Sequence, residues 1–329
     1  MNSTQKINYI NIGLMLFSAI AAMILPFEVF LFAYAFLGPL HYLTEISWLH
    51  DRNYYTKGKY DAIVLLCVGL LLLAAQLDRQ FEQLGLGLAS NNDILNRGIY
   101  IAFLSSIILV FVKNKWYKIL GVALVCITMY IADHWVLFIS VFLPTLVHVF
   151  VFTALFLLYG ALKSRSITGI ISFVVMLLCP VLLFTIMPDK IFIPITSYGL
   201  GAYKNFELLN QISLFKFFNI QRPDEQQIYF SSTGIVLMRF IAYAYTYHYL
   251  NWFSKTEIIK WHEVPKSRFA VVILLWLFSI GLYLKDYKLG FEWLYFLSFL
   301  HVLLEFPLNF ISITGIYKEV NNIISIPKK

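Results

Sequence analysis

Long apolar runs alternate with short polar connections along the whole chain. Runs of roughly 17–25 apolar residues are long enough to cross the hydrocarbon core of a bilayer as helices. The pattern predicts about ten membrane spans, at 8–25, 27–49, 60–77, 98–113, 117–133, 136–161, 167–187, 232–253, 268–285 and 291–315. The expected fold class is all-α, a polytopic transmembrane helical bundle that occupies residues 1–329 as a single membrane domain.

One connection is much longer than the others. Residues 188–231 contain several Pro and Gly residues, and the apolar patch from Ile212 to Phe218 predicts a short amphipathic helix at the membrane interface. The first apolar run has no small-residue cleavage site after it, so we interpret it as a retained helix and not as a signal peptide.

Composition supports a membrane protein. Of the 329 residues, 60% are hydrophobic and 13% are charged, whereas a soluble domain carries roughly 25% charged residues. The net charge of +7 comes from basic residues clustered between the spans, where membrane topology and anionic lipids explain them, and nucleic-acid binding is not expected. The three cysteines, Cys67, Cys126 and Cys179, lie inside apolar runs and are interpreted as packing residues.

The distribution of basic residues predicts the orientation. With ten spans, sixteen Lys and Arg residues fall on the side of the two termini and eight on the other side. Positive residues are retained on the cytoplasmic side. We therefore expect an integral protein of a bacterial-type inner or plasma membrane, with cytoplasmic termini and an external 188–231 loop.

Four histidines lie within apolar runs: His41, His148, His248 and His301. Ionisable residues at membrane depth are costly and mark functional sites. All four fall on even-numbered spans, which share one direction, and their depths differ by ~10 Å at about 1.5 Å rise per residue. They can therefore converge on one site and serve as metal ligands, although His148, which has no acidic neighbour on its own helix, can also be a core histidine satisfied by a hydrogen bond.

Two of these histidines precede a glutamate by one helical turn. His41 is followed by Glu45, and His301 by Glu305, with Pro39 and Pro307 nearby. Residues at i and i+4 share a helix face, so each pair directs an imidazole and a carboxyl group the same way. Either the glutamates bind the metal or take part in catalysis, or they hold the imidazole rings in place. A buried His–Glu hydrogen bond that only tightens packing is the remaining explanation.

The segment around His248 is rich in tyrosine. It predicts either an aromatic belt at the membrane interface or the wall of a pocket for a long unsaturated substrate. Arg239, two turns earlier, is expected to pair with a carboxylate or with the polar end of a substrate. The candidate pocket residues are Tyr243, Tyr245, Tyr247, Tyr249, Trp252 and Arg239.

The remaining histidines are weaker candidates. His50 and His262 are expected in solvated loops, and His134 with Asp133 at the external end of a span. The sequence has no HExxH, no clustered desaturase His box, no Walker A motif and no GxSxG motif.

The placement of histidines and acids resembles that of the Brp/Blh family of integral-membrane carotene-cleaving oxygenases. Leu40-His41-Tyr42-Leu43-Thr44-Glu45 stands where that family has an early Pro-His-Gly-x-x-Asp motif, with Leu and Tyr in place of Pro and Gly. Tyr247-His248-Tyr249 is similar to the family's late His segment, and His301 with Glu305 to its last motif. The resemblance implies an iron-dependent oxygenase that acts on an isoprenoid.

The expected function is that of a membrane-embedded oxygenase or other oxidoreductase with a metal cofactor, Fe²⁺ or another transition metal. Its expected partners are membrane lipids and a hydrophobic substrate, a lipid or an isoprenoid such as a carotenoid. A second hypothesis is an ion- or proton-coupled transporter that uses the same intramembrane His and Glu residues. A third is a non-catalytic membrane subunit whose histidines ligate haem.

Overall fold

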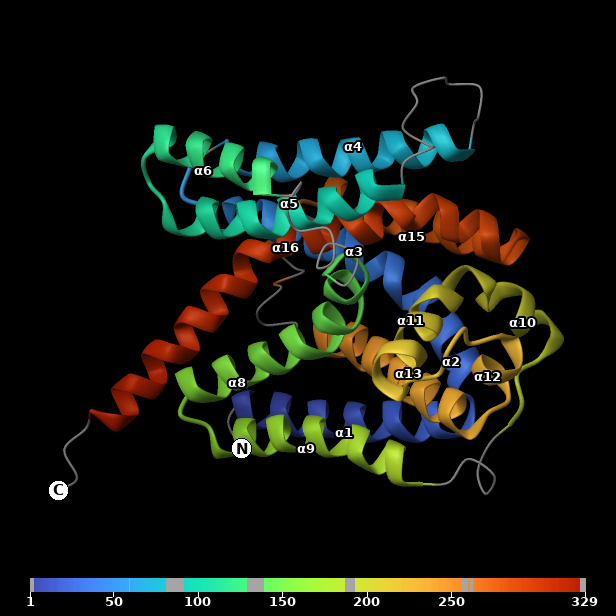
Figure 1. Ribbon diagram of the computed structural model, residues 1–329. Helices are drawn as coiled ribbons and strands as arrows, with labels where there is room; N and C mark the ends of the chain where they lie inside the picture. The colour runs from blue at the N-terminus through green and yellow to red at the C-terminus, as the bar shows by residue number, and fades with distance from the viewer. Residues whose placement is uncertain are drawn as a thin grey trace. The chain divides into compact units, whose positions relative to one another are not determined.

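The computed structural model describes residues 3–58, 60–80, 92–128, 139–186, 193–255, 260 and 263–325 (Figure 1). Throughout these ranges the elements are helices and no strand is present, which confirms the all-α class. The chain divides into two compact units. The first comprises Met1–His41, Val149–Leu294 and Glu319–Lys329, and the second comprises Tyr42–His148 and Tyr295–Lys318.

Six helical stretches of the described residues are long and apolar enough to cross a membrane. They are Ser3–Ile24, Pro26–His50, Ile139–Lys163, Ile167–Thr185, Lys266–Lys285 and Tyr287–Ile324. These helices are compatible with membrane insertion, but the predicted count of ten spans is not confirmed. Ala62–Ala74 and Arg97–Phe111 are shorter apolar helices. The predicted span at 232–253 does form a helix, but its tyrosines, Arg239 and Asn251 make it more polar than the six.

The first unit begins with α1 (Ser3–Ile24), α2 (Pro26–Phe32), the π-helix η1 (Ala33–Leu37) and the start of α3 (Gly38–His50). It continues through α8 (Thr153–Lys163) and α9 (Ile167–Thr185), then three short helices and a 3₁₀ turn. These are α10 (Ser197–Tyr203), η5 (Lys204–Phe206), α11 (Glu207–Phe218) and α12 (Glu225–Tyr229). It ends with α13 (Ser232–Ser254), α15 (Lys266–Lys285) and the start of α16 (Tyr287–Ile324). The helix predicted near residue 212 is therefore present as α11; its position at a membrane interface stays a prediction.

Side-chain oxygens mark where the helices of the first unit begin. Ser166, Ser231 and Asp286 each accept a hydrogen bond from the backbone N–H three residues later, at the starts of α9, α13 and α16. Such caps satisfy N–H groups that have no partner within the helix. Polar residues at these boundaries divide a largely apolar sequence into separate helices.

Helices α1, α9 and α13 lie side by side and are joined by polar contacts near both ends (Figure 1). At one end the Asn8 amide donates to Ser166 Oγ and Thr168 Oγ1 at the start of α9. Asn11 Oδ1 accepts from Ser254 Oγ at the end of α13. The N-termini of α1 and α9 therefore lie beside the C-terminus of α13, so α1 and α9 run parallel and α13 runs antiparallel to both.

The second unit contains the 3₁₀ turn η2 (Asn53–Tyr55), α4 (Ala62–Gln80), α5 (Asn92–Phe111) and α6 (Lys115–Thr128). Most of the π-helix η3 (Leu143–Phe152) and the central part of α16 also belong to it. Helix α5 packs against both α4 and α6 (Figure 1). The ring of Phe103 on α5 packs between those of Phe306 and Phe310 on α16.

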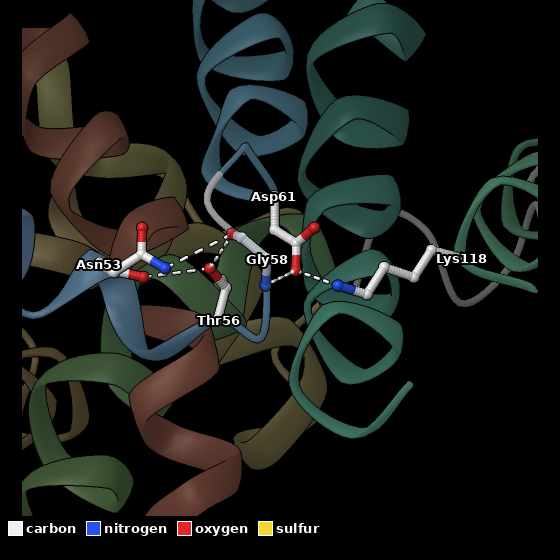
Figure 2. A network of polar contacts seen from close by, with 5 residues as sticks. All are labelled: Asn53, Thr56, Gly58, Asp61 and Lys118. Atoms are coloured by element: carbon white, nitrogen blue, oxygen red, sulfur yellow. Dashed lines mark hydrogen bonds and ion pairs between the residues drawn. The ribbon is translucent and has the colours of Figure 1, made fainter. Parts of the chain in front are cut away.

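A buried ion pair ties α6 to the loop before α4. Figure 2 shows Lys118 Nζ donating to Asp61 Oδ2, which also accepts from the Gly58 N–H at 2.7 Å. Thr56 Oγ1 donates to the Asn53 carbonyl at 3.0 Å and closes the same loop (Figure 2). The Lys118 side chain is 9% exposed and that of Asp61 is 13% exposed, so the ion pair is largely shielded from solvent.

Candidate metal centre

His41 follows an irregular stretch of helix. In the π-helix η1 the Gly38 N–H donates to the Ala33 carbonyl, and Pro39 has no N–H to continue the ordinary pattern. The Phe36 carbonyl, in the same π-helical turn, accepts from the Trp276 indole N–H of α15 at 2.8 Å. Such π-helical turns often occur at functional sites. Here the turn sets the position of α3, and His41 is only 1% exposed.

In the first unit His41 meets His248. Their Nε2 atoms lie 3.0 Å apart and the rings are nearly perpendicular, at 79°. Thr153 Oγ1 lies 2.8 Å from His248 Nδ1, within hydrogen-bond distance. The Tyr249 and Trp252 rings pack beside His41, with centroids at 5.2 and 5.5 Å. The pair is buried and enclosed by aromatic side chains.

In the second unit His148 meets His301, with their Nε2 atoms 3.1 Å apart. His148 lies in the π-helix η3, which is broken at Thr145 (φ −110°, ψ −105°) just after Pro144. The Tyr42 ring stacks on the His301 ring, with centroids 4.2 Å apart. Both histidines are almost completely buried.

Glu305 contacts His148 within this unit. Its Oε2 lies 3.3 Å from His148 Nδ1, an ion-pair distance at which the angle is not that of a hydrogen bond. His301, one turn before Glu305 on α16, directs its own Nδ1 to the Leu297 carbonyl at 3.3 Å. The other acidic candidate, Glu45 on α3, is 3% exposed.

The contact between the two Nε2 atoms, 3.1 Å apart, has two explanations. Either one ring donates an Nε2–H to the other, or both Nε2 atoms carry lone pairs and share a cation, a metal ion or a proton. The Leu297 carbonyl at His301 Nδ1 and the Glu305 carboxyl group near His148 Nδ1 favour the proton on Nδ1 of each ring. That form of each ring would leave both Nε2 atoms available to a metal.

The four histidines together form a buried group that could hold a transition metal. One ring nitrogen from each lies within 4.8 Å of all the others. Nitrogen ligands about 2.0–2.1 Å from one ion lie roughly 2.8–3.4 Å apart for bond angles between octahedral and tetrahedral. The Nε2–Nε2 distances within the two pairs, 3.0 and 3.1 Å, fall in that range. Neutral imidazoles suit Zn, Cu, Fe and Ni, so the ligands do not specify which metal binds.

The tyrosines of α13 face two different environments. Tyr243 and Tyr247 stack on each other, and their hydroxyl groups donate to the Met176 carbonyl of α9 and to Asn11 of α1. Tyr245 packs on Phe30 of α2, whereas Tyr249 contacts His41. Of the six candidate pocket residues, Tyr249 and Trp252 therefore contact a candidate ligand in the first unit, and Tyr243 and Tyr247 join helices.

Arg239 is completely buried at the other end of α13. Its Nε donates to the Met23 carbonyl at 3.0 Å, and one terminal nitrogen donates to the Ile186 carbonyl at 2.9 Å. These carbonyls belong to the C-terminal ends of α1 and α9, where a cation complements the helix dipole. The contacts described for Arg239 thus hold two helix ends beside α13.

The sequence interpretation missed Thr153 and Tyr42. Thr153 is a single hydroxyl in an apolar run, five residues after His148, and Tyr42 directly follows His41. Neither has a pattern that links it to a histidine on another helix. Among the weaker candidates, the His50 side chain is 65% exposed, while His134, Asp133 and His262 lie outside the described residues.

Comparison of the chain with protein-family models, curated proteins and solved structures finds no match.

Proposed function

We propose that this protein is a membrane-embedded, metal-dependent oxidoreductase in which His41, His148, His248 and His301 bind one transition metal, with Fe²⁺ as the expected ion. The observation that carries the proposal is that His148 and His301, two members of the buried group of four histidines, face each other with their Nε2 atoms 3.1 Å apart. The pair in the first unit, His41 with His248, has a similar Nε2–Nε2 distance of 3.0 Å.

The surrounding residues orient the proposed ligands. With a proton on each Nδ1, the Glu305 carboxyl group and the Leu297 carbonyl would orient His148 and His301 and leave Nε2 available to a metal. Thr153 Oγ1, 2.8 Å from His248 Nδ1, would accept the proton of that ring in the same role. Partners of this kind fix the tautomer of a ligand histidine, and their loss usually weakens metal binding by about 10–100-fold.

The substrate that this proposal assigns is a hydrophobic one, a lipid or an isoprenoid such as a carotenoid. Bound iron would supply the redox chemistry that allows dioxygen to react with a hydrocarbon. The Tyr249 and Trp252 rings beside His41 offer flat apolar surfaces for an extended unsaturated chain. The motif-level resemblance to carotene-cleaving oxygenases favours an isoprenoid, and burial keeps water from the site.

A proton- or ion-coupled transporter is the second candidate. Two of the four histidines lie on irregular helices, His148 within η3 and His41 just after η1. Transporters place ion sites at such interrupted helices. In a transporter the cation between the Nε2 atoms of His148 and His301 would be a proton on its way across the membrane.

One experiment separates these candidates. Cells supplied with carotenoid or another polyprenoid lipid would express the wild type, His41→Ala and His301→Ala, and oxygen-dependent loss of substrate would be followed. The oxygenase proposal requires that cells with the wild type lose the substrate and that cells with either variant do not. Full turnover by His41→Ala, or loss that persists without oxygen, contradicts it. A proton flux in proteoliposomes that His301→Ala abolishes would favour the transporter.

A further inference from the structure

A separate pocket of about 290 Å³ lies within the first unit, between α2, η1, α10, α15 and the start of α16. This volume is at the lower end of the range for small-molecule sites. Its wall is almost entirely carbon, from aliphatic and aromatic side chains. Glu28 on α2 is the one acidic residue among those that line it.

One carboxyl oxygen of Glu28 accepts a hydrogen bond, and the other has no partner among the described residues. Its Oε1 accepts from the Thr196 N–H at 2.9 Å. Its Oε2 is buried from solvent and has no hydrogen-bond partner among the described residues, nor does any described cation form an ion pair with Glu28. A buried carboxylate oxygen without a donor is costly, and such groups in native proteins call for an explanation.

Two aromatic pairs stand on different walls of this pocket. Phe32 and Phe36 are stacked with centroids 5.2 Å apart, and Tyr283 and Tyr287 meet edge to face at 4.8 Å. Gly290 allows the second pair to form, because a Cβ there would lie 2.4 Å from the Tyr283 ring. Aromatic faces attract cations, and a carboxylate beside them adds a counter-charge.

The pocket is also accessible from the surface of the helices. Leu284 is 82% exposed and Phe32 is 61% exposed, on two helical stretches that are long and apolar enough to cross a membrane. The aliphatic residues Leu31, Ala35 and Ile280 continue the apolar wall. A ligand that enters from the bilayer can therefore place a hydrocarbon chain along them.

We propose that this pocket binds a single-chain amphiphile with an ammonium head group, the head at Glu28 and the chain along Leu31 and Ile280. The Glu28 carboxylate, which no described cation pairs with, supplies an ammonium group with a counter-charge and a charge-assisted acceptor. An alkanol satisfies the acceptor without neutralising the charge, and a fatty acid would bring a like charge to Glu28. The site is independent of the histidine cluster and of any metal.

The test measures saturable binding of a radiolabelled primary alkylamine to the full-length protein in nanodiscs, with the alkanol and the alkanoate of the same chain length as competitors. The alkylamine should compete best and the alkanoate least. Glu28→Gln keeps an acceptor for the Thr196 N–H but removes the charge, so it should weaken amine binding by about 10–100-fold. Glu225→Gln, at a 65% exposed side chain, is the matched control and should bind like the wild type.

Two further measurements complete the design. Ile280→Trp should abolish binding of every probe by filling the pocket, and its elution as a monodisperse species shows that it is folded. His41→Ala should bind the amine normally, which separates this proposal from the metal proposal. Equal affinity for amine and alkanol, unchanged binding by Glu28→Gln, or loss of binding in His41→Ala would each overturn the assignment.

Discussion

The Nε2 atoms of His148 and His301 lie 3.1 Å apart, although 153 positions separate the two residues in the sequence. His148 Nδ1 lies 3.3 Å from Glu305 Oε2 and His301 Nδ1 lies 3.3 Å from the Leu297 carbonyl, which favours the proton on Nδ1 of each ring and leaves Nε2 available to a cation. This relationship predicts a bound cation more directly than the number of histidines does.

Metal content provides the first prediction. The purified protein should contain about one transition-metal ion per chain, and His148→Ala or His301→Ala should lose it, because each removes a nitrogen from the proposed site. Elemental analysis of detergent-purified protein measures this. His50→Ala is the control, since the His50 side chain is 65% exposed, and it should retain the metal. Metal-free wild type would contradict the proposal.

Glu305 provides a second prediction. Glu305→Gln should weaken metal affinity by about 10–100-fold, because an amide orients the His148 imidazole less strongly than a carboxylate. Competition with a graded series of chelators measures the change. Glu292→Gln, which alters a partly exposed glutamate on the same helix, should have no effect. If Glu305→Gln abolished binding as fully as His148→Ala, Glu305 would be a direct ligand.

Arg239 is predicted to be structural. Arg239→Met removes the donors to the Met23 and Ile186 carbonyls and should lower the free energy of unfolding by about 2–5 kcal/mol. The exposed Arg165, paired with Glu319 at 3.3 Å, is the matched position, and Arg165→Met should cost less than about 1 kcal/mol. Unfolding equilibria in detergent measure both. If the two substitutions lowered the free energy of unfolding equally, Arg239 would not stabilise the fold by joining the ends of α1 and α9.

The segment between α9 and α13, which contains α11 and α12, should stabilise the protein less at high pH. The Tyr229 hydroxyl donates to Glu207 at 2.6 Å, and burial first, then the Glu207 carboxylate, raises the pKa of this tyrosine. A raised pKa in the folded state gives stability that is complete below the unfolded pKa of about 10 and is lost as the pH rises above it. Tm should therefore fall more steeply above pH 10 in the wild type than in Tyr229→Phe. An equal dependence of Tm on pH in the wild type and in Tyr229→Phe would contradict this prediction.

Topology can be tested with single cysteines in a background where Cys67, Cys126 and Cys179 are replaced by alanine. Lys163 and Lys216 are both exposed, one before α9 and one on α11. The charge bias predicts that Lys163→Cys reacts only with a reagent applied from the cytoplasm, and Lys216→Cys only from outside. Reaction of both from one side would overturn the predicted orientation.

The sequence by itself determined the helical class and the candidate ligands. Hydropathy over about twenty residues is a local property, so the positions of long apolar helices can be read along the chain. The four histidines were identifiable because polar groups are rare in such runs. The number of spans was less certain, because helices such as α13 carry enough polar residues to fall between a span and a buried helix.

Only the tertiary structure decided which residues meet. The i+4 spacing of His301 and Glu305 placed both on one face of α16, but a helix face does not specify the partner that packs against it. In the structure that partner is His148, to which Glu305 turns. The tyrosine-rich segment of α13 was visible in the sequence. Which of its tyrosines face α1 and α9, and which faces His41, depends on helix packing that no local pattern records.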